Sequence, residues 1–146
     1  MNPVERFISL SGYPDAPAAA SNGAVALRIG GTRVEFKAME NGARLSLTAA
    51  MPPLPPEAGE AQARLLELLR LALPRSLKED AVLCYDPDAR ALLLWQEFAV
   101  PGEDAEFLRL VNGFLNAREW WAARISAPSE AAPASGSSPQ LMFFRP

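Results

Sequence analysis

Residues 24–51, AVALRIGGTRVEFKAMENGARLSLTAAM, decide the fold. Apolar and polar side chains alternate along this stretch with a period of two, which is typical of half-buried β-strands. Gly30-Gly31 and Asn41-Gly42 divide the stretch into three runs. Both dipeptides favour tight hairpins, because a type I′ turn needs positive φ at its two central residues. The stretch therefore predicts a three-stranded antiparallel meander.

One side of this meander is expected to be buried and the other to be solvated. Arg33, Glu35 and Lys37 alternate with Val34 and Phe36 in the second run, so polar and apolar side chains point in opposite directions. The apolar side is predicted to hold Val25, Leu27, Ile29, Val34, Phe36, Leu45 and Leu47.

Two helices are predicted to flank the meander in the chain. The first covers residues 3–10 and is short, because Gly12 and Pro14 follow it. The second covers residues 57–73, and its apolar surface is wider than the single stripe of a one-sided surface helix. Pro74 is expected to end it.

A second hairpin and a last helix are predicted in the remainder. Residues 81–85 and 90–100 form the two strands, and Asp86-Pro-Asp-Ala89 is conventional turn sequence between them. Residues 92–95 are all apolar, so both faces of the returning strand require cover. Phe and Leu at helical spacing predict the last helix over residues 104–125. The fold class is thus α+β, with the order α-βββ-α-ββ-α.

The length of 146 residues fits one α+β domain, assigned to residues 1–127. Residues 128–146 are predicted to be a flexible tail, because Ala, Pro, Ser and Gly dominate as far as Pro139 and cannot bury enough apolar area to offset chain entropy. Leu141-Met-Phe-Phe144 is apolar again. This segment either docks on its own domain or meets a partner.

Composition argues against several classes of function. The chain has no histidine, which removes the commonest general base and metal ligand. Its one cysteine, Cys84, excludes a disulfide framework and is expected to be a small core residue. Net charge is -3 with scattered basic residues, so nucleic acid is not an expected partner. No apolar run is long enough to insert in a membrane, and a cytoplasmic location is expected.

No catalytic residue, metal site or cofactor is predicted. Asp86 and Asp88 are explained by turn formation, and acidic residues near 104 by the start of a helix. A small enzyme that uses carboxylates alone, with Glu97 or Asp104 at a pocket, stays as a competing hypothesis. It lacks a nucleophile, an oxyanion site and a paired acid and base.

The last third carries a family resemblance. ALLLWQEFAVPGEDAEFLRLVNGFLNAREWWAARI, residues 91–125, resembles the closing pattern of the class I type III secretion chaperones, the Tir chaperone family. In that pattern an apolar strand leads through a loop with Pro and acidic residues into a helix with spaced Phe and Leu, then an acidic residue and Trp. The order of elements over residues 1–127 is similar to that family as well.

The resemblance implies a cytoplasmic homodimer that is not an enzyme and that binds the N-terminal segment of a secreted effector in extended form. A regulatory protein of the same fold, which sequesters a cytoplasmic regulator of secretion or transcription, is the alternative. The resemblance places the dimer interface on the second helix and on the fourth and fifth strands. The implied interface residues are Leu66, Leu69, Leu73, Leu92 and Leu94, and the implied partner-binding residues are Phe7, Ile8, Leu10, Val34 and Phe36.

Overall fold

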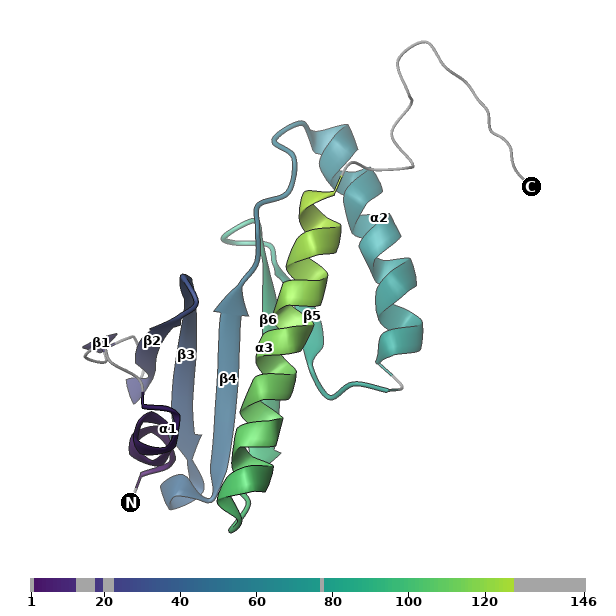
Figure 1. Cartoon of the computed structure of the whole chain (residues 1–146). Helices are drawn as coiled ribbons and strands as arrows, with labels where there is room; N and C mark the ends of the chain where they lie inside the picture. The colour runs from purple at the N-terminus through teal and green to yellow at the C-terminus, as the bar shows by residue number, and fades with distance from the viewer. Residues whose placement is uncertain (1, 13–17, 20–22, 77, 128–146) are drawn as a thin grey trace.

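The computed structural model describes residues 2–12, 18–19, 23–76 and 78–127. They form an antiparallel sheet whose strand order is β1-β2-β3-β4-β6-β5 (Figure 1). The meander and the second hairpin join where β4 pairs with β6. The strands are β1 (Ala18–Ala19), β2 (Val25–Ile29), β3 (Thr32–Met39), β4 (Arg44–Ala50), β5 (Val82–Asp86) and β6 (Ala91–Ala99).

Three α-helices accompany the sheet: α1 (Pro3–Ser11), α2 (Ala58–Arg75) and α3 (Asp104–Ser126). At α1 and α2 the residue before the helix uses its side chain to satisfy orphan amides of the first turn. Asn2 accepts from the amide of Val4 at 2.7 Å. Glu57 accepts from the amides of Gly59 and Glu60 at 3.0 and 2.7 Å, and these hydrogen bonds hold the pKa of its carboxyl below the ordinary value.

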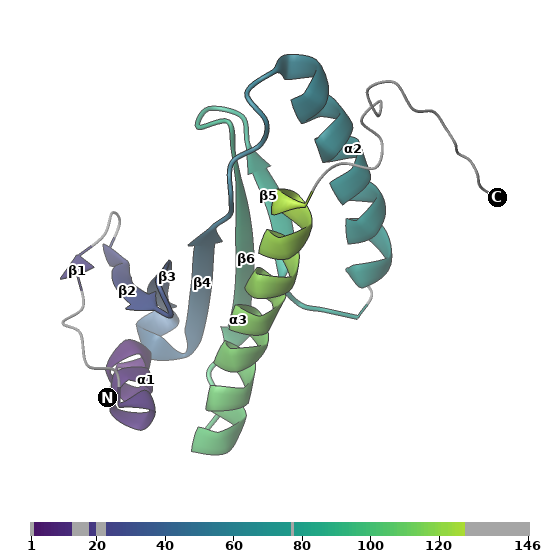
Figure 2. The same ribbon diagram turned by 45° about the horizontal axis from the view of Figure 1, so that its top comes forward.

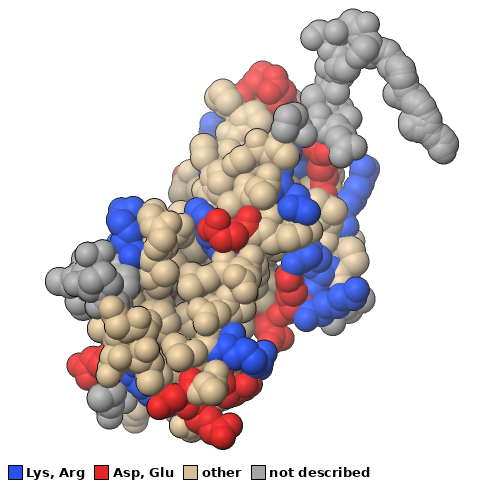
Figure 3. All heavy atoms as spheres, viewed as in Figure 1, with Lys and Arg blue, Asp and Glu red and all other residues tan. Residues whose placement is uncertain are grey.

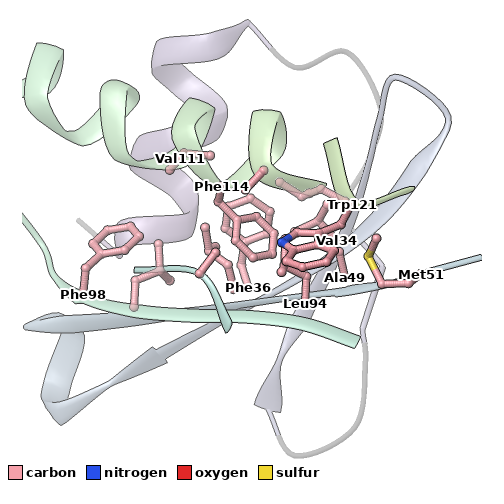
Figure 4. Packing of buried hydrophobic residues seen from close by; sticks show 14 of the residues in the cluster. Val34, Phe36, Ala49, Met51, Leu94, Phe98, Val111, Phe114 and Trp121 are labelled. Carbon is pink, nitrogen blue, oxygen red and sulfur yellow. The ribbon is translucent and has the colours of Figure 1, made fainter. Parts of the chain in front are cut away.

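The core lies between the sheet and α3, and Figure 4 shows aromatic rings of the two layers in contact there. Register places Val34 opposite Ala49 and Phe36 opposite Leu47, so their side chains share one face. The predicted assignment of the meander's apolar face is therefore confirmed. Other side chains fully buried against this face are Leu27, Leu45, Leu94, Phe107, Val111 and Phe114.

α2 lies outside the sheet, beyond β5 and beside the C-terminal half of α3 (Figures 1 and 2). Among its apolar side chains only Leu68 is fully buried. Arg64 is also buried and donates to backbone carbonyls at the end of α3. At the other end of α2, the Arg75 guanidinium lies 3.5 Å from the ring centre of Trp120, and that of Arg124 lies 4.0 Å from it.

The predicted order of elements is confirmed, with four local differences. The two-residue strand β1 was not predicted. The turn at Asn41-Gly42 is longer than a two-residue turn, because Glu40–Gly42 forms the short 3-10 helix η2. Pro74 does not end α2, which continues to Arg75. Cys84 is half-buried and pairs with Leu93 on the face opposite the core. The predicted tail, residues 128–146, lies outside the described residues.

Candidate functional site: two apolar surfaces

Four half-buried apolar residues lie on α1 and β2, and the area that they border is here called the α1–β2 surface; its two α1 residues are about 200° apart and flank the buried side of that helix. They pack against the core without being enclosed by it. Register puts the two β2 residues on the helix-bearing face, because Val25 lies opposite Phe36 and Leu27 opposite Val34. α3 covers the neighbouring strands and leaves this part of the face less covered. The α1–β2 surface consists of Ile8, Leu10, Val25 and Ile29.

A cavity of about 330 Å³ extends this surface to α3. Ile29 and Thr32 line it from the sheet, and Leu115 and Arg118 line it from the helix. Figure 3 shows a broad area of uncharged side chains on this side of the molecule, interrupted partway up by a group of acidic and basic side chains. A trough in which apolar side chains stand beside polar and charged ones can accept apolar side chains of an extended peptide.

Arg6 holds α1 in the position that creates this surface. It donates to Asp104 at the start of α3, and to the carbonyl oxygens of Pro101 and Gly102 at 2.7 and 2.8 Å. Its guanidinium also lies 4.8 Å from the ring centre of Phe107. One side chain therefore joins the first helix to the loop and helix that follow β6.

Three of the residues implied for partner binding are in the chain's own core. Val34 and Phe36 have no exposed area, and Phe7 stacks on Phe36 with ring centres 5.2 Å apart. Their assignment to a groove was wrong, because α1 and α3 already cover that face. Ile8 and Leu10 stay partly exposed. The sequence did not predict Val25, Ile29 and Leu115 as site residues. The alternation in β2 indicates that Val25 and Ile29 lie on the apolar face, but it does not indicate how far the helices cover that face.

The second surface is an exposed stripe on α2, here called the α2 stripe. Leu66, Leu69 and Leu73 are 49%, 56% and 73% exposed. They recur at i, i+3 and i+7, so they lie on one side of the helix. Three exposed leucines in a row form an apolar surface of the kind that marks protein contacts. Val82 and Tyr85 on the adjacent edge strand β5 are also exposed.

Leu92 and Leu94 do not belong to an exposed interface. Both are buried under the helices, and they alternate with side chains that point to the opposite face of the sheet. The predicted interface included these two leucines because residues 92–95 are all apolar, but neighbouring residues of a strand face opposite sides of the sheet, and Leu92 and Leu94 face the core. On that opposite face Leu93 is half-buried and Trp95 is 38% exposed, with its indole nitrogen donating to Ser46 at 3.1 Å.

Strand β1 affects where a further strand could be added. Ala18 and Ala19 pair with Ala26 and Val25 on the edge of β2. The first half of that edge already has a backbone partner. Strand addition by a peptide at this edge is therefore limited to residues after Ala26, or requires β1 to leave.

The carboxylates of the competing enzyme hypothesis are engaged in ion pairs. Glu97 accepts from Arg44 at 2.6 Å on the polar face of the sheet, and Asp104 accepts from Arg6 at 2.8 Å. Asp86 accepts from the amides of Asp88 and Ala89, which confirms its role in the turn. Within the described ranges, no three His, Cys, Asp or Glu side chains group in a way that could hold a metal ion.

The described part of the chain also has no helix that combines the length and apolar character needed to cross a membrane.

Comparison with known proteins identifies the family. The model of the Tir chaperone protein (CesT) family matches residues 5–122. The chain belongs to this family. The match runs from α1 to α3 and so includes both apolar surfaces. A search of curated protein sequences gives no match for this member of the Tir chaperone family.

Solved structures share the fold of this Tir chaperone family member at low sequence identity. A chain of the ExsC–ExsE complex is 16% identical with a TM-score of 0.61, and the alignment covers 87% of this chain and 93% of that one. The Yersinia pestis type III secretion chaperone SycH, solved with a fragment of YscM2, is 19% identical with a TM-score of 0.57, and the alignment covers 85% of this chain and 97% of that one. A chain of the ExoU–SpcU heterodimer of Pseudomonas aeruginosa is 19% identical with a TM-score of 0.55, and the alignment covers 84% of this chain and 98% of that one.

Proposed function

We propose that this protein is a cytoplasmic type III secretion chaperone without catalytic activity. It binds the N-terminal segment of a secreted effector in extended form and keeps that effector soluble and competent for secretion. Family membership across residues 5–122 carries the proposal. Related folds occur in the HopA1–SchA chaperone–effector complex and in the type III secretion chaperone SycH, which supports the same function here.

The α1–β2 surface is the proposed client site. Ile8, Leu10, Val25 and Ile29 provide half-buried apolar contacts, and the adjoining cavity at Leu115 can receive a client side chain. Contacts of this kind favour an unfolded segment, because a folded domain would have its apolar side chains already buried. The client is therefore held by side chains in the trough, while the core beneath it stays unchanged.

The α2 stripe is the proposed homodimer contact. Its three leucines and the exposed Val82 lie on α2 and β5, at the far edge of the sheet from β2. Self-association through this edge would leave the α1–β2 surface of each subunit accessible. Each subunit can then bind part of the same client.

The test is recovery of partners by the tagged full chain from its native bacterium, with identification by mass spectrometry. We expect a stoichiometric secreted protein that binds through a segment near its N-terminus. Ile8→Glu places a charge on the client surface and should reduce recovery at least about tenfold, since burying an uncompensated charge costs several kcal/mol. Ser9→Glu adds the same charge at an exposed position of α1 and is the matched control.

Circular dichroism shows whether both variants are folded. Recovery of a cytoplasmic regulator in place of a secreted protein would support the regulatory alternative. No stoichiometric partner, or equal recovery by the two variants, would contradict the proposed client site.

A further inference from the structure

The sequence after α3 contains one apolar segment with no role so far. Leu141, Met142, Phe143 and Phe144 are consecutive, and residues 128–140 before them contain only small or polar side chains and proline. Two adjacent phenylalanines can bury a large apolar area in a suitable pocket. The segment therefore has the chemistry of a tethered ligand.

The start of this tether has a fixed position. Arg64 of α2 is buried, and its guanidinium donates to the carbonyl oxygen of Arg124 at 3.1 Å and also to that of Ala127. The last described residue is thus joined to the N-terminal half of α2. Residues 128–146 follow in the sequence from that place.

A cavity of about 550 Å³, here called the α2–β5 pocket, adjoins the same half of α2. Ala61 and Leu65 belong to its wall and lie three residues before and one residue after Arg64. Arg90 is its single charged lining residue. The volume is within the range of about 300–1,000 Å³ that is usual for ligand pockets. The other lining residues are Leu54, Pro55, Pro56, Ala58, Gln62 and Tyr85.

The tether is long enough to reach this pocket. Residues 128–140 span up to roughly 40 Å when extended, whereas α2 with its 18 residues is about 27 Å long. A short tether gives the segment that it carries an effective concentration in the millimolar range. Even weak contacts then produce substantial occupancy.

We propose that Leu141–Phe144 docks in the α2–β5 pocket, with the phenyl rings of Phe143 and Phe144 against its proline, leucine and tyrosine side chains. The α1–β2 surface is a less favourable site for this segment. Arg6 holds the α1 part of that surface at the start of α3, which is about 35 Å long over its 23 residues, whereas residue 127 lies at the other end of α3. The inference does not depend on the proposed function.

Photo-crosslinking in the full chain tests this docking. p-Benzoylphenylalanine replaces Phe143, and mass spectrometry locates the crosslinked residues. We expect crosslinks within residues 54–65 and 85–90. Ala61→Glu, which places a charge in the pocket wall, should abolish them. Leu71→Glu, an exposed position further along α2, is the matched control and should leave them in place.

Mixing isotope-labelled and unlabelled protein shows whether the segment occupies its own pocket or that of another copy; either result supports the docking. Crosslinks to the α1–β2 surface, to the α2 stripe or to no site would overturn it.

Hydrogen exchange gives a second measurement with the natural amino acids. The double variant Phe143→Ala, Phe144→Ala should lower occupancy at least about tenfold, since two buried phenyl groups are lost. Amide exchange within residues 54–65 should then become faster. Ser135→Ala with Ser137→Ala is the matched control in the tail and should behave as the unaltered chain. Equal protection in all three proteins would contradict the inference.

Discussion

Arg6 on α1 donates from Nε and Nη2 to the same carboxylate oxygen of Asp104 on α3, at 3.0 and 2.8 Å. The Arg6 side chain is 19% exposed and Asp104 is 61% exposed, so the two partners differ in their surroundings. Asp104 contributes mainly this ion pair, whereas Arg6 also has two backbone acceptors and the ring of Phe107. The position of the first helix depends on Arg6 more than on its acidic partner.

Arg6→Ala should lower the free energy of unfolding by about 1–2 kcal/mol, because hydrogen bonds from a charged donor are lost together with the ring contact. Urea denaturation followed by circular dichroism measures this change. Asp104→Asn should have an effect below about 1 kcal/mol, as expected for an exposed ion pair. Equal losses in the two variants would show that the other contacts of Arg6 contribute nothing.

Leu69→Glu together with Leu73→Glu should convert the proposed dimer into a monomer, because two charges would lie in its apolar contact. Sedimentation equilibrium gives the mass in solution. Leu71→Glu is the control: it is also exposed on α2, but it lies two residues, or about 200° of helix rotation, from Leu69. A double variant with the mass of the unaltered protein would exclude this contact.

Trp120 and Trp121 are neighbours with unequal contributions to stability. Trp121 is buried in the core, so Trp121→Ala should cost about 3–5 kcal/mol of unfolding free energy. Trp120 is half-buried between Arg75 and Arg124, and Trp120→Ala should cost less, about 1–2 kcal/mol. Thermal and urea unfolding compare them. Trp120→Ala should also speed amide exchange near Arg75, where α2 is attached to α3.

Glu57 predicts a pH dependence of stability. Hydrogen bonds from the amides of Glu60 and Gly59 lower its pKa below the ordinary value. Its contribution is therefore present above the unfolded pKa of about 4.3 and is lost as pH falls through the folded pKa. Glu57→Gln should lower the melting temperature at pH about 7, and the difference should shrink as the pH falls below about 4.3 and the carboxyl becomes protonated.

Glu103→Gln is the control for that series. Glu103 precedes α3 in the same way, but its side chain makes no capping hydrogen bond. Melting temperatures of this variant should parallel those of the unaltered chain. A Glu57→Gln difference that persists at low pH would contradict the assignment.

The sequence predicted the sheet well because hairpin turns define register. Gly30 and Gly31 both have positive φ, and Ile29 pairs with Thr32 across them. Once register is defined, period two determines which side chains share a face. The apolar face of the meander followed directly from these two glycines. The order of the later elements followed from helical spacing and from the turn at Asp86.

The candidate site was predicted less well, because pattern alone does not tell which apolar side chains are left uncovered. Val34 and Ile29 belong to the same alternating series, yet Val34 is fully buried and Ile29 only partly. The difference arises from where α3 crosses the sheet, which is a tertiary property. The same holds for Leu92 and Leu69: both are leucines of predicted apolar surfaces, but only Leu69 faces outward.

The insertion of β6 between β4 and β5 has a consequence for the kinetics of folding. Neighbouring strands in the meander and in the β5–β6 hairpin are close in sequence, so each unit can form by local closure. The β4–β6 ladder, in which Ala49 pairs with Leu94, must instead close a loop that contains all of α2. Closure of this ladder is the slow, non-local step that turns two hairpin units into one sheet.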